Sequence, residues 1–255
     1  MAKTILNFQI IDNKQINIGF FILELLSDVV LPEIYPGQFV QVRIDGSRET
    51  FLRRPFSVHD IDRSTNSIKL LIQIAGEGTK TLSLMQKGGI LNIILPLGNS
   101  FSLPSKGEKS LLIGGGCGVA PLLFLAKYLK SNGCEFDILM GFRNKDRIIE
   151  YDDFSKLNKV YLTTEDGSEG EKGYVINHSV LSENKYDHIY CCGPDAMMKA
   201  VAKYSYKHKI HCEVSLENLM ACGIGACLCC VVNTTNGNVC SCTEGPVFNI
   251  NNLKW

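Results

Sequence analysis

Cysteines are concentrated in one short stretch of the chain. Six of the eleven fall between positions 222 and 242, namely Cys222, Cys227, Cys229, Cys230, Cys240 and Cys242. Cys222, Cys227 and Cys230 follow the spacing C-x4-C-x2-C, which, with one further cysteine, is the spacing of plant-type [2Fe–2S] ligation. Gly223 and Gly225 suit a loop that takes unusual backbone angles and brings amide N–H groups close to sulfur. The pattern predicts four thiolates around two irons.

Other uses of these cysteines match the spacing less well. A structural zinc site commonly pairs two C-x2-C knuckles, and here only Cys227 and Cys230 form one. Disulfides are disfavoured because the cysteine count is odd and no export signal is visible. We expect Cys229, which stands between two ligands, to point away from the metal. Spacing alone leaves both Cys240 and Cys242 open as the fourth ligand.

The segment Arg53-Arg54-Pro55-Phe56-Ser57 carries groups that bind phosphate. A guanidinium forms paired hydrogen bonds with phosphate oxygens, and the proline fixes an extended backbone beside the serine hydroxyl. Further along, Gly76 to Thr79 opens a predicted helix whose first N–H groups suit a pyrophosphate. Each segment also has an ordinary explanation, a surface arginine before an edge strand and a capped helix start. Their occurrence together favours a nucleotide cofactor.

A third candidate is the run Gly114-Gly115-Gly116-Cys117-Gly118, between an apolar strand and a helix. Such a turn can cradle phosphate in dinucleotide sites. It departs from G-x-G-x-x-G at Val119, and Phe142-Arg143 stands where an acidic residue usually ends the second strand. The segment 190–195 follows another apolar strand and would occupy a carboxyl-end position, where ligands lie in doubly wound sheets. A buried small hydrophobe is the alternative for Cys192.

The elements that must position these residues change character along the chain. From Ile5 to about Leu103, short apolar or alternating segments are separated by Gly and Pro turns, and a single short helix is predicted over 79–85. This is typical of an antiparallel barrel or sandwich. Beyond a polar linker, strands at 110–113, 136–142, 160–164 and 189–192 alternate with helices at 119–130 and 195–208, which predicts βαβ units and a parallel sheet.

We therefore expect a β barrel plus an α/β domain, followed by a small cysteine-rich subdomain. The expected boundaries are 1–104 for the barrel, 105–210 for the α/β domain and 211–255 for a subdomain stapled by its metal.

Composition excludes several classes of function. Lys plus Arg and Asp plus Glu both number 26, so the formal net charge is zero and no basic field favours nucleic acid or anionic lipid. No apolar run is long enough to span a membrane, and the N-terminal segment does not read as a signal peptide. Unpaired thiols in this number suit a reducing cytoplasm.

The order of these motifs resembles that of the ferredoxin-NADP reductase superfamily, which joins a flavin-binding antiparallel barrel to a nicotinamide-binding α/β domain. The segment from Met220 to Val232, together with Cys242-Thr-Glu-Gly-Pro-Val-Phe, is most similar to the iron–sulfur flavoprotein (electron transfer) subunits of NAD-dependent, type B dihydroorotate dehydrogenase. The resemblance covers essentially the whole chain.

The resemblance implies specific contacts. For FAD these are Arg54, Pro55, Phe56, Ser57, Leu71, Ile72, Gln73, Gly78 and Thr79. For NAD they are Gly115, Gly116, Gly118, Pro121, Cys192, Gly193, Pro194 and Asp195, together with the segment 164–167. For the [2Fe–2S] cluster they are Cys222, Cys227, Cys230 and Cys242. The resemblance favours Cys242 over Cys240 because Cys242 directly precedes Glu-Gly-Pro-Val-Phe.

Nicotinamide moves electrons in pairs as hydride, whereas an iron–sulfur cluster accepts them singly, so a flavin must stand between the two. The resemblance implies a flow from dihydroorotate to FMN on a catalytic partner subunit, then to the cluster, FAD and NAD+, in pyrimidine (UMP) biosynthesis. It also implies a heterotetramer of two catalytic and two electron transfer subunits. No catalytic acid or base is expected in this chain, and Cys192 would lie near the nicotinamide. The five histidines lack ligand spacing and are read as structural or surface residues.

Two other functions fit parts of the pattern. A subunit of an NAD(P)H:ferredoxin or sulfide-linked bifurcating oxidoreductase would share the barrel, the glycine loop and the cluster. A zinc-stapled binding protein without redox activity would share only the cysteines, and would be colourless.

Overall fold

The computed structural model describes residues 3–47 and 49–255, so Met1 and Ala2 of the expected N-terminal segment lie outside it. The chain divides into two compact units. The first comprises 1–100, 218–232 and 238–246, and the second comprises 101–217, 233–237 and 247–255. This differs from the three expected domains, because the segment 211–255 is shared between the two units instead of forming a body of its own.

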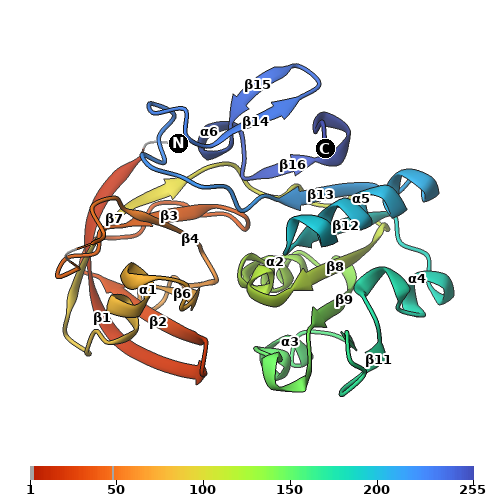
Figure 1. Cartoon of the computed structure of the whole chain (residues 1–255), viewed down its shortest axis with the longest axis horizontal. Helices are drawn as coiled ribbons and strands as arrows, with labels where there is room; N and C mark the ends of the chain where they lie inside the picture. Colours follow the sequence, from red (N-terminus) through yellow and green to blue (C-terminus); the bar gives the residue numbers. More distant parts are fainter. Residues whose placement is uncertain (1–2, 48) are drawn as a thin grey trace. The chain divides into compact units, whose positions relative to one another are not determined.

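The first unit is built on a seven-stranded antiparallel sheet in the order β4-β3-β7-β1-β2-β6-β5. Its elements are β1 (Thr4–Asn17), β2 (Phe20–Ser27), β3 (Phe39–Val42), β4 (Arg54–Ser57), β5 (Asp60–Asp62), β6 (Ser67–Gln73), α1 (Glu77–Ser83) and β7 (Ile90–Leu97). β4 also contacts β6, which lies far from it in the hydrogen-bonded order. The sheet therefore curls on itself, as a barrel requires (Figure 1).

Alternation along the strands builds the barrel core. In β2, Phe21, Leu23 and Leu25 are fully buried and the residues between them are half-buried. Phe8 and Ile10 of β1 join them from the neighbouring strand. Successive side chains of a strand point to opposite faces, so one face of this hairpin supplies the core. Each such side chain contributes about 1.5–3 kcal/mol on burial.

The second unit is a mostly parallel sheet in the order β11-β10-β9-β8-β12-β13-β16, in which only β16 runs antiparallel. Its strands are β8 (Lys109–Gly115), β9 (Glu135–Phe142), β10 (Val160–Thr164), β11 (Glu171–Lys172), β12 (His188–Cys192), β13 (His211–Ser215) and β16 (Val247–Asn249). Its helices are α2 (Ala120–Ser131), α3 (Tyr151–Ser155), α4 (Val180–Glu183) and α5 (Asp195–His208). β8 therefore has β9 on one side and β12 on the other, which is the switch point at which open α/β sheets bind ligands.

The expected fold class is confirmed, and the structure shows how far the parallel sheet extends. The helix expected at 195–208 is α5, and the strands expected in the second half are β8, β9, β10 and β12. The parallel sheet continues beyond residue 210, however, because β13 pairs with β12 and β16 pairs with β13. β16 has only three residues, and β13, although as long as β10 and β12, lies in the segment expected to form the cysteine-rich subdomain.

The rest of the cysteine-rich segment is small. It forms a two-stranded hairpin of β14 (Val231–Thr234) and β15 (Gly237–Cys240), followed by α6 (Ser241–Glu244). Among the described residues, no helix combines the length and the apolar character needed to cross a membrane.

Candidate functional sites

We call residues 218–232, together with Cys240 and Cys242, the cysteine loop. It packs on the barrel strand β3 within the first unit. Phe39 of β3 and Leu97 of β7 form one buried hydrophobic cluster with Cys230 and Cys242. Ile94, Met220 and Cys240 pack against this cluster. Cys230, Cys240 and Cys242 therefore sit on side chains of the barrel, although no periodic pattern in the sequence links the two segments.

The thiols of the predicted ligands lie close enough to interact. Cys222 interacts with Cys227, and Cys242 interacts with Cys230. Cys240 interacts with Cys230 in the same way, so these interactions alone do not separate Cys240 from Cys242. Among the described residues, no three His, Cys, Asp or Glu side chains converge as the ligands of a single ion would.

Backbone N–H groups of the loop point at these sulfurs. The N–H of Ile224 donates to Cys222 Sγ at 3.4 Å, and that of Gly225 donates to Cys242 Sγ at 3.2 Å. Burial raises the pKa of the Cys222 thiol, but N–H groups of residues 224, 226 and 227 outweigh it and lower that pKa to about 6. Burial, together with the Cys230 thiol, raises the pKa of Cys242 to about 12. N–H donors directed at sulfur favour its anionic, metal-binding form.

The loop needs both of its glycines. Gly223 and Gly225 have φ of +70° and +87°, in the left-handed region that L side chains rarely adopt. A β-carbon at 223 would lie 2.6 Å from Cγ of Gln41, and one at 225 would lie 2.9 Å from Cγ2 of Thr243. Leu228 also has a positive φ, of 60°, which is uncommon for a leucine and turns the chain between Cys227 and Cys229.

Exposure differs among the cysteines of the loop. Cys227 and Cys229 are both exposed, whereas Cys230 is buried, so exposure alone does not distinguish the predicted ligand Cys227 from Cys229. Cys242 is fully buried and Cys240 is half-buried. Within the described residues the cysteines form no disulfide.

The predicted flavin segment is the edge strand β4, and its two arginines play different parts. Arg53 Nη1 donates to the carbonyl of Asn92 at 2.8 Å, and Nη2 donates to the Asn92 side chain at 2.5 Å. Among the described residues, Arg54 donates to the nearby carbonyl of Leu52, at 2.9 Å, and to that of its neighbour Arg53. The Arg53 side chain is therefore tied to β7, while the contacts described for Arg54 are to its own chain segment, which leaves its guanidinium able to turn to a ligand.

The other predicted flavin residues lie at the end of β6 and in α1. Leu71 and Ile72 are buried and Gln73 is exposed. Thr79 Oγ1 accepts the N–H groups of Ala75 and Gly76 at 2.9 and 3.1 Å, which fixes the turn before α1. A β-carbon at Gly78 would lie 3.0 Å from Thr50, so the chain passes close to its neighbour there. β4 contacts β6, which brings the two main predicted segments together.

The two predicted nicotinamide segments meet in the second unit. The glycine run ends β8 and forms the short helix η1 (Gly116–Val119), while Cys192 ends the adjacent strand β12. A β-carbon at Gly118 would lie 2.3 Å from the carbonyl oxygen of Cys192, and one at Gly115 would lie 2.4 Å from Met197 Sδ. The two loops touch through their main chains at the switch point of the sheet, and only glycine allows this approach.

The thiol of Cys192 is protonated at neutral pH. Burial raises its pKa well above the ordinary value, and the charge of Glu217 acts in the same direction. Pro121 lies in the first turn of α2, beside the same glycine run. In the segment 164–167, the Thr164 hydroxyl donates to the carbonyl of Glu169 at 2.7 Å, so it closes a turn after β10.

Comparison with known proteins places this geometry in a family. Residues 217–254 match the iron-sulfur cluster binding domain of dihydroorotate dehydrogenase B, and residues 112–203 match an oxidoreductase NAD-binding domain. The dihydroorotate dehydrogenase B (NAD(+)), electron transfer subunit of Caldanaerobacter subterraneus subsp. tengcongensis is 44% identical over 220 residues, which cover 84% of this chain and 85% of that protein. The chain belongs to this electron transfer subunit family. Its relative in Fusobacterium nucleatum subsp. nucleatum is 38% identical over 93% of both chains.

Solved structures outside this electron transfer subunit family share its fold. The NADH-dependent reduced ferredoxin-NADP oxidoreductase, solved for insight into flavin-based electron bifurcation, aligns with a TM-score of 0.88 and 31% identity, covering 100% of this chain and 92% of that chain. Phthalate dioxygenase reductase aligns with a TM-score of 0.67 at 18% identity and covers 91% of this chain and 87% of that one. The family domain at 217–254 contains all four predicted ligands, which favours iron–sulfur over zinc.

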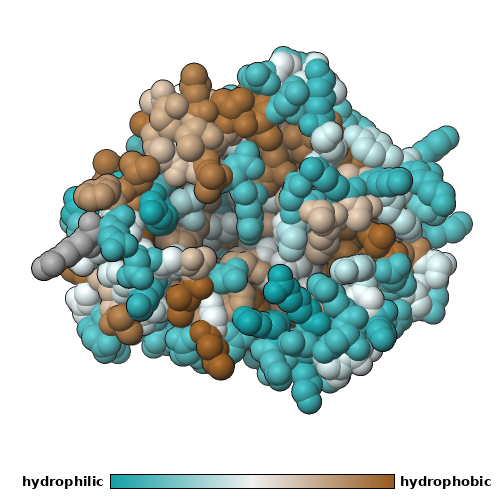
Figure 2. All heavy atoms as spheres, viewed as in Figure 1, coloured by the Kyte–Doolittle hydropathy of each residue, from teal (hydrophilic) through white to brown (hydrophobic). Residues whose placement is uncertain are grey.

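Apolar side chains of the family's cluster-binding segment reach solvent around the cysteines. Leu219 is 86% exposed, Leu228 is 65% exposed and Ile224 is 46% exposed, and Val231 follows them at 41%. We call these four residues the loop patch. Figure 2 shows hydrophobic atoms gathered over the loop that precedes β14. Contiguous exposed apolar side chains of this kind mark interaction surfaces.

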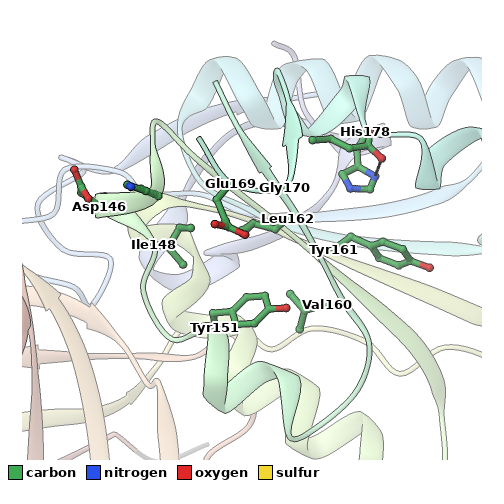
Figure 3. A pocket seen from close by; sticks show the side chains of 11 residues that line it. Asp146, Ile148, Tyr151, Val160, Tyr161, Leu162, Glu169, Gly170 and His178 are labelled. Atoms are coloured by element: carbon green, nitrogen blue, oxygen red, sulfur yellow. Dashed lines mark ion pairs between the residues drawn. The ribbon is translucent and has the colours of Figure 1, made fainter. Parts of the chain in front are cut away.

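Two features were missed in the sequence. The first is a cavity of about 790 Å³ in the second unit, beside β10 and lined among others by Lys145, Tyr151, Glu169 and His178 (Figure 3). None of the predicted cofactor residues lines it. The second is Gln41, a fully buried side chain of β3 that touches the cysteine loop. A glutamine in a short strand gives no signal of such a contact.

The histidines occupy structural positions. His59, His178 and His188 are buried, whereas His208 and His211 are exposed. His178 Nδ1 accepts the N–H of Val180 at 3.1 Å, and burial lowers its pKa against the raising effect of nearby carboxylates.

Proposed function

We propose that this chain carries electrons between a [2Fe–2S] cluster held by Cys222, Cys227, Cys230 and Cys242, an FAD on β4 and β6, and an exchangeable NAD at the loops after β8 and β12. The observation that carries the proposal is the pairing of β3 with β4. Phe39 and Gln41 of β3 contact the cysteine loop. In the antiparallel pairing of β3 with β4, Phe39 lies opposite Ser57 and Gln41 lies opposite Pro55 of the flavin segment. Paired strands lie about 4.8 Å apart, so the two cofactors would share one wall of the barrel.

Each group of residues has a definite task in this scheme. The four cysteines and the N–H donors of the loop would hold the cluster as thiolates. Arg54 would bind an FAD phosphate, and Ser57 would hydrogen-bond the flavin. Bound FAD would supply the exchange of a hydride with nicotinamide and of single electrons with the cluster. The close-packed glycine loops would present N–H groups to the NAD phosphates without side chains in the way.

Cys242 is our choice for the fourth ligand. It is fully buried, it accepts the N–H of Gly225 and it pairs with Cys230. Cys240 also interacts with Cys230, but it is only half-buried and packs against the buried cluster without being one of its buried members.

The implied partner is the FMN-containing catalytic subunit of dihydroorotate dehydrogenase, in a complex of two catalytic and two electron transfer subunits. The names of the relatives support it, because each is the electron transfer subunit of that enzyme. The loop patch would dock the partner over the cluster, which would shorten the path for electrons. Leu219→Glu should abolish co-purification of the partner while the cluster spectrum stays, and Ile18→Glu, at a site 98% exposed in the β1–β2 turn, should change neither.

The test is anaerobic affinity purification of this chain from its own cells, followed by an assay for NAD+ reduction on adding dihydroorotate. We expect an FMN protein to co-purify and the complex to reduce NAD+. A brown flavoprotein that contains iron and sulfide but ignores dihydroorotate and reduces ferredoxin would instead support the NAD(P)H:ferredoxin reaction. The TM-score of 0.88 to the NADH-dependent reduced ferredoxin-NADP oxidoreductase is the observation that favours this second function.

A further inference from the structure

Gln41 is a buried polar side chain without a hydrogen-bond partner. Its relative exposure is 0%, and neither Nε2 nor Oε1 has a partner among the described residues. Leaving a buried amide unpaired costs about 1–3 kcal/mol, so such groups are rare and usually have a reason. Gln38, three positions earlier and also buried, shows the usual situation. Its Oε1 accepts the N–H of Tyr35 at 2.8 Å, and its Nε2 donates to the carbonyl of Gly98 at 2.9 Å.

The carboxamide of Gln41 faces the cysteine loop. A β-carbon placed on Gly223 would lie 2.7 Å from Gln41 Nε2 and 3.0 Å from Cδ, so the amide lies directly against the residue that follows Cys222. Side chains two apart in a strand share a face, and Phe39, two residues before Gln41, packs on Cys230 and Cys242. Gln41 is thus a polar group in a floor that is otherwise formed by Phe39, Leu97 and other apolar side chains.

The strand position of Gln41 fixes this orientation. Its backbone pairs with Pro55 of β4 on one side and Ile94 of β7 on the other, and its carbonyl accepts a hydrogen bond from Arg53 Nη1 at 3.3 Å. The backbone pairing therefore keeps this side chain on the face of β3 that contacts the cysteine loop. A donor held in place before the metal arrives is what a second layer of cluster contacts requires.

We infer that Gln41 Nε2 donates a hydrogen bond to a sulfur of the cluster and raises its reduction potential. The inference rests on the proposed function, since it assumes that the loop holds the cluster. Reduction adds negative charge to the sulfurs, so a donor stabilises the reduced form more than the oxidised form. Gln41 is a positioning and tuning residue and takes no part in the ligation itself.

The experiment compares Gln41→Met with Gln38→Met in the full chain, loaded with cluster and FAD under anaerobic conditions. Methionine keeps most of the volume but donates no hydrogen bond. We expect Gln41→Met to lower the ratio of reduced to oxidised cluster at a fixed ambient potential by roughly tenfold, a shift of about 59 mV for one electron. The electron paramagnetic resonance signal of the reduced cluster should also change, while the flavin potential stays.

Gln38→Met should reduce thermal stability and leave the cluster potential and signal as in the wild type. If Gln41→Met does not load its cluster, Gln41→Leu serves as the second variant, and it should lower the potential in the same direction because it also donates no hydrogen bond. A wild-type cluster potential and signal in every loaded Gln41 variant would overturn the inference, and so would a shift confined to the flavin. Absence of iron and sulfide from the wild-type protein would instead overturn the proposed function.

Discussion

The cysteine loop on the barrel and the glycine loops of the α/β unit differ in how completely their own residues pack. The glycine loops after β8 and β12 are complete by themselves, because they touch and leave no room even for a β-carbon at Gly115 or Gly118. The cysteine loop contains a left-handed leucine and exposed apolar side chains, and it lies against an unpartnered buried glutamine of β3. An exchangeable ligand such as NAD needs a site that persists without it, whereas a resident cluster can be part of the structure that forms its own site.

The largest effect should come from the ligands themselves. Cys227→Ser should remove the cluster entirely, because one iron would lose a thiolate, whereas Cys229→Ser should keep full iron and sulfide content. The measurement is iron and acid-labile sulfide per chain, with the visible spectrum. Equal loss in the two variants would contradict the ligand assignment. The pair Cys242→Ser and Cys240→Ser tests the fourth ligand in the same way, and we expect loss only from the former.

The glycine loops should respond through packing alone. Gly118→Ala places a methyl group 2.3 Å from the Cys192 carbonyl, so the two loops must separate, at a cost of about 3 kcal/mol in unfolding free energy and with weaker NAD binding. Gly116→Ala is the control, because the added methyl group meets no atom within 4 Å. Its cost in unfolding free energy should be only the backbone strain of an alanine at a φ of +54°, about 1 kcal/mol. Thermal unfolding measures the cost in both variants, and NADH titration measures the loss of binding in Gly118→Ala. Similar losses from the two variants would show that the close approach is not what matters.

At Arg54, the flavin segment should show an intermediate effect, on cofactor binding and not on folding. Arg54→Ala should weaken FAD binding by roughly ten- to a hundredfold, the effect of losing charge-assisted hydrogen bonds, while the melting temperature of the flavin-free protein stays nearly the same. Arg53→Ala should lower that melting temperature, since its guanidinium ties β4 to Asn92. Arg63→Ala, with a single long contact to the Pro32 carbonyl, should affect neither quantity. Unchanged flavin content in Arg54→Ala would remove Arg54 from the site.

The smallest effect concerns pH and the α/β unit. Burial lowers the pKa of His178 below that of the unfolded chain, so the unfolded state takes up a proton first as the pH falls below about 6.5. The stability that this neutral ring provides is therefore present above that pH and lost below it. Protonation of Nδ1 would also break its hydrogen bond with Val180, so we expect the melting temperature to fall by a few degrees between pH 7 and pH 5. His178→Asn should flatten this slope, and His208→Asn, at an exposed ring, should not.

Much of this molecule was predictable from local patterns. The spacing of Cys222, Cys227 and Cys230 indicated the cluster, and the strand-glycine-helix order around Gly116 indicated the α/β unit, because both signals lie within a few consecutive residues. What the sequence could not reveal depends on contacts between distant segments. The assignment of β13 and β16 to the parallel sheet, the different roles of Arg53 and Arg54, and the contact of Gln41 with Gly223 all appear only when strands are paired in register.

The packing of the cysteine loop on Phe39, Gln41 and Leu97 limits how this protein can be recombined. A chimera that grafts residues 218–246 onto another reductase would bring the ligands without their floor. The graft would also include residues 233–237, which belong to the other compact unit and would lose their own neighbours. The barrel and its cysteine loop would therefore have to be transferred together, and a change of the cluster site should be made by substitutions within these two segments.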